Sequence, residues 1–90
     1  MTEKILLRLF ITGHTPRSEQ AIANLYRICQ ERLDERYEVE IVDILEQPQL
    51  AEEERIIATP TLIRVSPLPA RRVIGDLSDT KKVLLGLSLY

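Results

Sequence analysis

Few side chains in this sequence of 90 residues have the chemistry of a nucleophile, a general base or a metal ligand. Cys29 is the only cysteine and His14 the only histidine. A histidine that acts as a base needs a nucleophile within reach, and no cysteine or obvious serine partner accompanies His14. One histidine and one cysteine also fall short of the usual zinc ligand sets. We therefore expect no catalytic residue, no metal site and no cofactor.

Two further groups of reactive side chains have ordinary structural interpretations. Cys29 falls on the apolar stripe of a predicted helix, where a free cysteine behaves as a small buried hydrophobe. Glu52, Glu53 and Glu54 follow one another near the start of a second predicted helix, where acids complement the helix dipole. Consecutive helical residues point in different directions around the axis, so three adjacent carboxylates do not converge on a metal ion.

Composition and charge narrow the class of protein. Apolar residues make up 44% and charged residues 29% of the sequence, which is typical of a soluble globular domain, and we expect one domain over residues 1–90. The net charge of −2 and the sparse basic pairs at residues 71–72 and 81–82 argue against a nucleic-acid partner. No apolar stretch is long enough for a membrane span, and one cysteine suits a reducing compartment. We expect a cytoplasmic protein that binds neither nucleic acid nor membrane.

The first half of the chain predicts a strand, a helix and a second strand. Residues 5–12 form an almost unbroken apolar run, typical of a central strand. Gly13 can adopt a positive φ, Thr15 is a good N-cap and Pro16 suits the first position of a helix that extends to about Leu33. Residues 37–44 then alternate between apolar and acidic side chains, which indicates a strand. This order favours a parallel βαβ unit.

The second half is harder to assign. We predict a short helix over residues 49–58, a turn and then a strand over residues 58–65, and a further short strand over residues 71–76. A helix over residues 79–89, capped by Ser78, follows. Residues 83–87 are also acceptable strand material, and Gly86 within the helix costs about 1 kcal/mol relative to alanine, so both alternatives stay open. The helical alternative gives the order βαβαββα, an α/β fold of the thioredoxin type, with Thr59–Pro60 as a natural site for a cis peptide.

A thioredoxin-type oxidoreductase carries a C-x-x-C pair where the first strand meets the helix, because the helix N-terminus lowers the thiol pKa. In this chain the corresponding residues 13–18 read GHTPRS and contain no cysteine. The thioredoxin-like fold is therefore predicted without thioredoxin chemistry.

Five segments in sequence resemble the KaiB family of circadian clock proteins. They are LFITGHTP at residues 9–16, DILEQPQLAEE at 43–53, IATPTL at 57–62, PLPARRVIGDLSD at 67–79 and VLLGL at 83–87. Each segment alone is weak evidence, but their order and spacing cover almost the whole chain. The resemblance implies a non-enzymatic component of a cyanobacterial circadian oscillator.

The same resemblance implies two folds and a set of partners. One fold is a ground state, a homotetramer or dimer of order βαββααβ. The other is a monomeric thioredoxin-like state that binds the N-terminal ATPase ring of KaiC, captures KaiA and displaces the kinase SasA. The helix–strand ambiguity falls in the half of the chain that switches in this family, and two such folds coexist only when they differ by a few kcal/mol.

Residue positions follow from the resemblance as well. The KaiC-binding residues would be Arg55, Ile56, Ile57 and Ala58, with Arg71 and Arg72 as charge partners, and the fold-switch hinge would include Pro60, Pro67, Pro69 and Gly86. Ile56 and Ile57 are equally typical of core residues, and a solvated arginine pair is as plausible as a bidentate contact with acids.

The second strand departs from the family pattern. Where clock members present a lysine to KaiA, this chain has Glu38 and Glu40, which reverse the local charge and should weaken KaiA binding. An alternative function follows: a divergent KaiB paralogue, or a SasA-like sensor module, that binds another ATPase or kinase in a different signalling or stress response.

Overall fold

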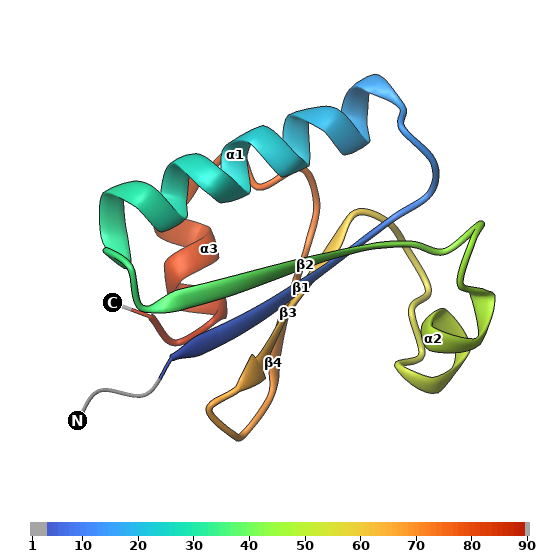
Figure 1. Cartoon of the computed structure of the whole chain (residues 1–90). Helices are drawn as coiled ribbons and strands as arrows, with labels where there is room; N and C mark the ends of the chain where they lie inside the picture. The colour runs from blue at the N-terminus through green and yellow to red at the C-terminus, as the bar shows by residue number, and fades with distance from the viewer. Residues whose placement is uncertain (1–3, 90) are drawn as a thin grey trace.

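A four-stranded mixed sheet forms the centre of the fold in the computed structural model, which describes residues 4–89 (Figure 1). The strand order is β2-β1-β3-β4; β1 runs parallel to β2 and antiparallel to β3, and β3 runs antiparallel to β4. The predicted order βαβαββα is confirmed. The elements are β1 (Ile5–Ile11), α1 (Pro16–Arg32), β2 (Tyr37–Asp43), α2 (Pro48–Glu53), β3 (Thr61–Ser66), β4 (Arg71–Ile74) and α3 (Thr80–Gly86).

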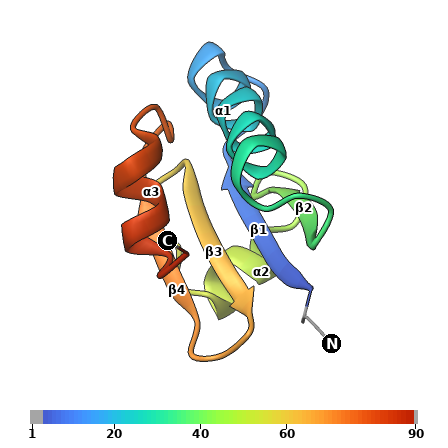
Figure 2. The ribbon, with the colours of Figure 1, turned by 90° about the vertical axis from the view of Figure 1, so that its left-hand side faces the viewer.

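The two faces of the sheet carry two separate cores. On one face, Leu7, Leu9 and Ile11 of β1 pack with buried residues of α1 and α3, both of which cover that face (Figure 2). On the other face, Phe10, Val42 and Ile63 form a smaller buried cluster. Alternate residues of β1 therefore serve alternate faces, which explains the unbroken apolar run of this strand.

The first helix begins as its sequence predicts. Thr15 accepts a hydrogen bond from the Ser18 amide at 3.1 Å through its hydroxyl oxygen, and Pro16 occupies the first turn. Ala21, Leu25, Ile28 and Cys29 are buried along one side of α1. Burial of this stripe, together with the cap, holds the helix on the sheet.

The second helix ends earlier than its sequence predicts. We expected it to reach Ala58, but α2 ends at Glu53 and Arg55 adopts a left-handed φ of 54°. The amide of Ile56 then donates to the Ala51 carbonyl at 2.9 Å and the Arg55 amide to the Glu52 carbonyl at 3.1 Å. This pair of bonds is a Schellman motif, which terminates a helix by satisfying its last carbonyls.

The third helix is also shorter than predicted. Asp79, and not Ser78, is the N-cap, because its carboxylate accepts from the Lys82 amide at 3.2 Å. At the other end α3 stops at Gly86, since Ser88 takes a φ of 57° and the Leu89 amide turns back to the Leu84 carbonyl at 2.7 Å. Within these bounds the C-terminal segment is helical, and Val83, Leu84 and Leu87 are buried as the sequence predicts.

Pro60 lies directly before β3, and Pro67 and Pro69 lie in the turn between β3 and β4. The peptide bonds before Pro60, Pro67 and Pro69 are all cis, and the first of these is the bond for which we expected this isomer. Among the described residues, no helix has the length and apolar character needed to cross a membrane.

Candidate functional site

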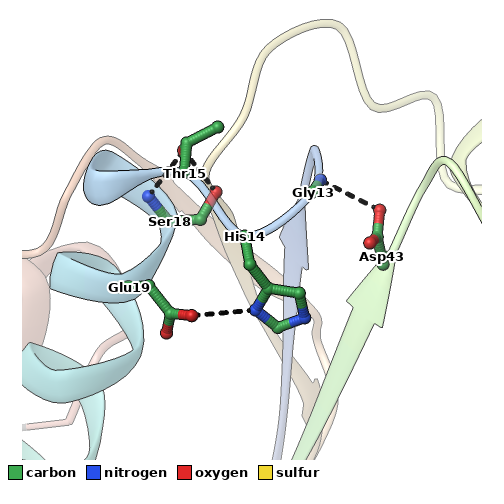
Figure 3. A network of polar contacts seen from close by, with 6 residues as sticks. All are labelled: Gly13, His14, Thr15, Ser18, Glu19 and Asp43. Carbon is green, nitrogen blue, oxygen red and sulfur yellow. Dashed lines mark hydrogen bonds and ion pairs between the residues drawn. The ribbon is translucent and has the colours of Figure 1, made fainter.

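The turn between β1 and α1 occupies the position of the thioredoxin thiol pair. Gly13 adopts a φ of 65° there, as the sequence predicts. Asp43, at the end of β2, accepts a hydrogen bond from the amide of Gly13 at 3.0 Å (Figure 3). It accepts a second from the Leu45 amide, also at 3.0 Å. These bonds, Gly13 first, hold the pKa of the Asp43 carboxyl below its usual value, so this carboxylate fixes the turn.

The only histidine of the chain points to α1. His14 Nδ1 lies 3.0 Å from Glu19 Oε1, and both side chains are largely exposed (Figure 3). No cysteine accompanies this pair, because Cys29 is buried in α1 and burial raises the pKa of its thiol to about 11. A thiol of such high pKa stays protonated near neutral pH. The described residues also contain no group of three or more potential metal ligands.

The four residues predicted to contact KaiC lie in the loop between α2 and β3, and the structure separates them. Ile56 packs against the smaller core, whereas Ile57 is 91% exposed and Ala58 is also exposed. With Thr12, Ile44 and Thr59 they line a shallow hollow of about 160 Å³. Ile56 is therefore a core residue, whereas Ile57 is available at the surface for contact with a partner.

The predicted arginine pair is also separated. In the β3–β4 register, Arg71 lies opposite Arg64 and Arg72 opposite Ile63, so their side chains leave opposite faces of the sheet. Arg72 donates to the Glu54 carbonyl at 2.9 Å and to the Arg55 carbonyl at 3.5 Å. It thereby joins β4 to the end of α2 through two hydrogen bonds of its guanidinium group. Arg71 is exposed.

The two glutamates of the predicted KaiA-facing strand have different surroundings. Both are exposed on β2, which is an edge strand of the sheet. Glu40 lies opposite Arg8 of β1, with 2.5 Å between Glu40 Oε1 and Arg8 Nε, while Glu38 lies opposite Leu6. Arg8 also approaches Glu54 at 3.9 Å. Part of the negative charge of this strand is therefore neutralised within the chain.

The sequence did not indicate a role for two residues on the sheet face that carries the smaller core. From its place in the sequence, Arg8 is only a charged residue within the apolar run of β1, whereas in the structure it joins β2 to the end of α2. Ile74 of β4 is 54% exposed and is a second residue to which the sequence analysis gives no role. The spacing of Arg72 and Ile74 was the available signal. Residues two apart in a strand lie on the same face, so Ile74 could have been placed beside Arg72.

These features define a class: a thioredoxin-like domain that lacks the thiol pair and presents an exposed apolar loop beside charged strands. The comparisons with known proteins agree with this class. The KaiB domain family matches residues 8–89, and the chain belongs to the KaiB family.

Two relatives illustrate the match. The circadian clock protein KaiB3 of Synechocystis sp. is 64% identical over 86 residues, which cover 96% of this chain and 84% of that protein. The circadian clock oscillator protein KaiB of Synechococcus elongatus is 50% identical over 84 residues, which cover 93% of this chain and 82% of that protein.

Solved structures support the fold. The N-terminal domain of SasA from Synechococcus elongatus superposes with a TM-score of 0.80 at 23% identity, covering 100% of this chain and 89% of that domain. Mitochondrial thioredoxin 3 from Saccharomyces cerevisiae gives a TM-score of 0.75 at 17% identity, over 97% of this chain and 79% of that protein. At such low identity these likenesses establish the thioredoxin-like fold alone.

Proposed function

We propose that this protein is a non-enzymatic circadian clock component that docks onto the N-terminal ATPase ring of a KaiC-type protein. The membership of the chain in the KaiB family over residues 8–89 carries the proposal, together with the clock names of the relatives. The thioredoxin-like state is the one proposed to bind. In binding, the protein would oppose KaiA and displace SasA, whose N-terminal domain has the same fold.

The proposed docking surface is the loop after α2 together with the adjacent part of β4. Ile57 is 91% exposed, so its removal from water favours association. Arg72 holds the end of α2 by its backbone carbonyls and thereby orients the loop, while exposed Arg55 supplies a charge beside Ile57. Buried apolar anchors with arginines nearby are typical of the energetic centre of an interface.

A pair of matched variants tests this surface. Ile57→Ser and Leu68→Ser each remove one exposed apolar side chain, at 91% and 81% exposure, from different loops. We expect co-elution with KaiC carrying phosphomimetic substitutions on size exclusion for the parent and for Leu68→Ser, with about a tenfold loss of affinity for Ile57→Ser. Failure of the parent chain to co-elute after prolonged incubation would contradict the proposal.

We also propose that the chain exchanges between the thioredoxin-like monomer and the oligomeric ground state expected for the family. Pro60, Pro67, Pro69 and Gly86 remain the proposed hinge residues. Backbone chemical shifts over residues 58–90 distinguish the two folds, because helix and strand shifts differ in sign. A single set of shifts at every concentration and temperature, with or without KaiC, would contradict the exchange.

A second function has its own support. The chain is 64% identical to a relative named KaiB3 and 50% identical to the Synechococcus elongatus KaiB, and its β2 strand carries Glu38 and Glu40. A KaiB paralogue that serves another ATPase or kinase fits both observations. Binding to such an ATPase or kinase without binding to KaiC would favour this second function, whereas KaiA capture by the KaiC-bound chain would favour the first.

A further inference from the structure

A hollow of about 400 Å³ lies where the end of α1 meets α3. Its lining residues are Arg32, Lys81, Leu84, Leu85 and Leu89. Both helices cover the face of the sheet opposite the smaller core that holds Ile56, so the hollow is separate from the proposed KaiC surface (Figure 2). Its size is within the range of natural binding pockets.

The floor of the hollow is apolar and continuous with the main core. Leu84 is buried and belongs to the cluster formed by β1, α1 and α3, against which Leu89 packs. Leu85 contributes an open wall, since its side chain is 56% exposed. One exposed leucine on a helix is ordinary. Leu85, however, lies beside a recess that reaches the core. An apolar side chain that enters this recess would be removed from water on several sides, which favours binding.

The rim of the hollow is positively charged. Arg32 and Lys81 line it, and Lys82 lines an adjoining hollow with Leu85. One carboxylate, that of Asp79, also lines the adjoining hollow, where it accepts a hydrogen bond from the Lys82 amide. All three cations are exposed, and none of them lies within ion-pair distance of a carboxylate in residues 4–89. Arg27 of α1, in contrast, pairs with Glu31 at 3.5 Å. Cations at the mouth of an apolar recess attract and orient an acidic partner.

We propose that this hollow is a docking site for an acidic amphipathic helix of a partner protein. One apolar side chain of that helix would enter between Leu84, Leu85 and Leu89, and carboxylates on its flanks would face Arg32 and Lys81. A helix that lays its apolar face into a groove is a recurrent mode of recognition. The recessed floor suits an inserted side chain better than a flat anionic bilayer, which would meet only Leu85 and the lysines.

The test uses the full chain and two fluorescent peptides of about 15 residues, long enough for a helix. Both carry leucines three and four residues apart; one has glutamates at the remaining positions and the other lysines. We expect the glutamate peptide to bind and to shift the amide resonances of residues 32, 81, 84, 85 and 89. Its affinity should fall about tenfold in Lys81→Glu and in Leu85→Gln, both exposed positions, and should fall with added salt.

Arg55→Glu is the matched control, because it makes the same charge reversal on the opposite side of the molecule and should leave peptide affinity unchanged. Conversely, Lys81→Glu should leave KaiC co-elution unchanged. Three results would overturn the proposal: equal affinity for the two peptides, resonance shifts confined to the loop after α2, or binding to phosphatidylglycerol vesicles with none to the glutamate peptide. Circular dichroism of each variant verifies that it is folded.

Discussion

Gly86, the last residue of α3, faces Val73 of β4 so closely that a methyl group on its α carbon would lie 2.5 Å from Val73 Cγ2. Glycine at this position therefore allows the end of the helix to approach the edge of the sheet. The sequence alone suggests a different role, since glycine weakens a helix by about 1 kcal/mol relative to alanine. Both effects act at the same residue and have opposite signs.

We predict that Gly86→Ala gains its full helical benefit of about 1 kcal/mol only when Val73 is also truncated. In the parent background, the methyl group would overlap Val73, whose β-branched side chain is stiff, so the clash cancels or outweighs the helical benefit. In Val73→Ala, the same substitution meets no such obstacle. A double-mutant cycle read from the population of the thioredoxin-like state by NMR measures this coupling. Equal effects of Gly86→Ala in the two backgrounds would show that the contact carries no energy.

Arg55 holds a backbone conformation that favours glycine, with φ at 54°. We predict that Arg55→Gly stabilises the thioredoxin-like fold by about 1 kcal/mol, because glycine adopts the left-handed region without a steric cost. Arg55→Ala is the control, since alanine retains the β carbon and should give no such gain. Urea unfolding with an unchanged m-value provides the measurement. An equal gain for both variants would point to the charge of Arg55 and away from its backbone.

Arg72 fastens β4 to the end of α2 through two backbone carbonyls. We predict that Arg72→Ala lowers the free energy of unfolding by about 1 kcal/mol. It should also speed hydrogen exchange of the Ile56 amide, which closes the end of the helix. Arg72→Lys should recover only part of the effect, because an ammonium group lacks the planar fork of a guanidinium. Arg71→Ala, on the other face of β4, should leave that amide unchanged.

The folded structure lowers the pKa of two carboxyl groups, Asp43 and Asp76. The pKa of Asp43 is lowered by the amides of Gly13 and Leu45, and that of Asp76 by Ser78 through its hydroxyl and its amide. A carboxyl whose pKa is lower in the folded chain contributes stability above its unfolded pKa of about 3.9, and this contribution is lost as the pH falls through the folded value. We therefore predict that unfolding becomes easier below about pH 4.

Asp43→Asn tests the origin of this acid sensitivity. Its amide oxygen can still accept a hydrogen bond, but it has no charge to lose. Thermal unfolding between acid and neutral pH should show a smaller decline for this variant than for the parent. An identical decline in the two proteins would assign the acid sensitivity to other groups.

The first half of the fold was predictable because its signals are local. Three signals depend only on residues close together in sequence. They are the apolar run of β1, the start of α1 at Thr15–Pro16, and the three- and four-residue spacing that places Cys29 on the apolar side of α1. The missing cysteine pair between residues 13 and 18 could be read directly. The order of the remaining elements followed from the helical alternative for residues 79–89, between which and a strand local propensity did not decide.

The tertiary structure decided the details of the candidate site. Local propensity could not show that α2 stops at Glu53, since the residue that turns the chain is an arginine and not the expected glycine. The division of Ile56 and Ile57 between core and surface was likewise not predictable, because adjacent apolar residues give the same local signal. Only the packing of Ile56 against the smaller core distinguishes them.

By itself, the sequence determined that this protein has a βαβ start, a capped amphipathic helix and no thiol pair for redox chemistry. Only the tertiary structure placed Arg8 against Glu40, Arg72 against the end of α2 and Gly86 against Val73. The physical reason is that hydrophobic periodicity reports which face of an element is buried, whereas these contacts join residues far apart in the chain. Their partners are fixed by strand register and helix ends, which depend on the packing of the whole domain.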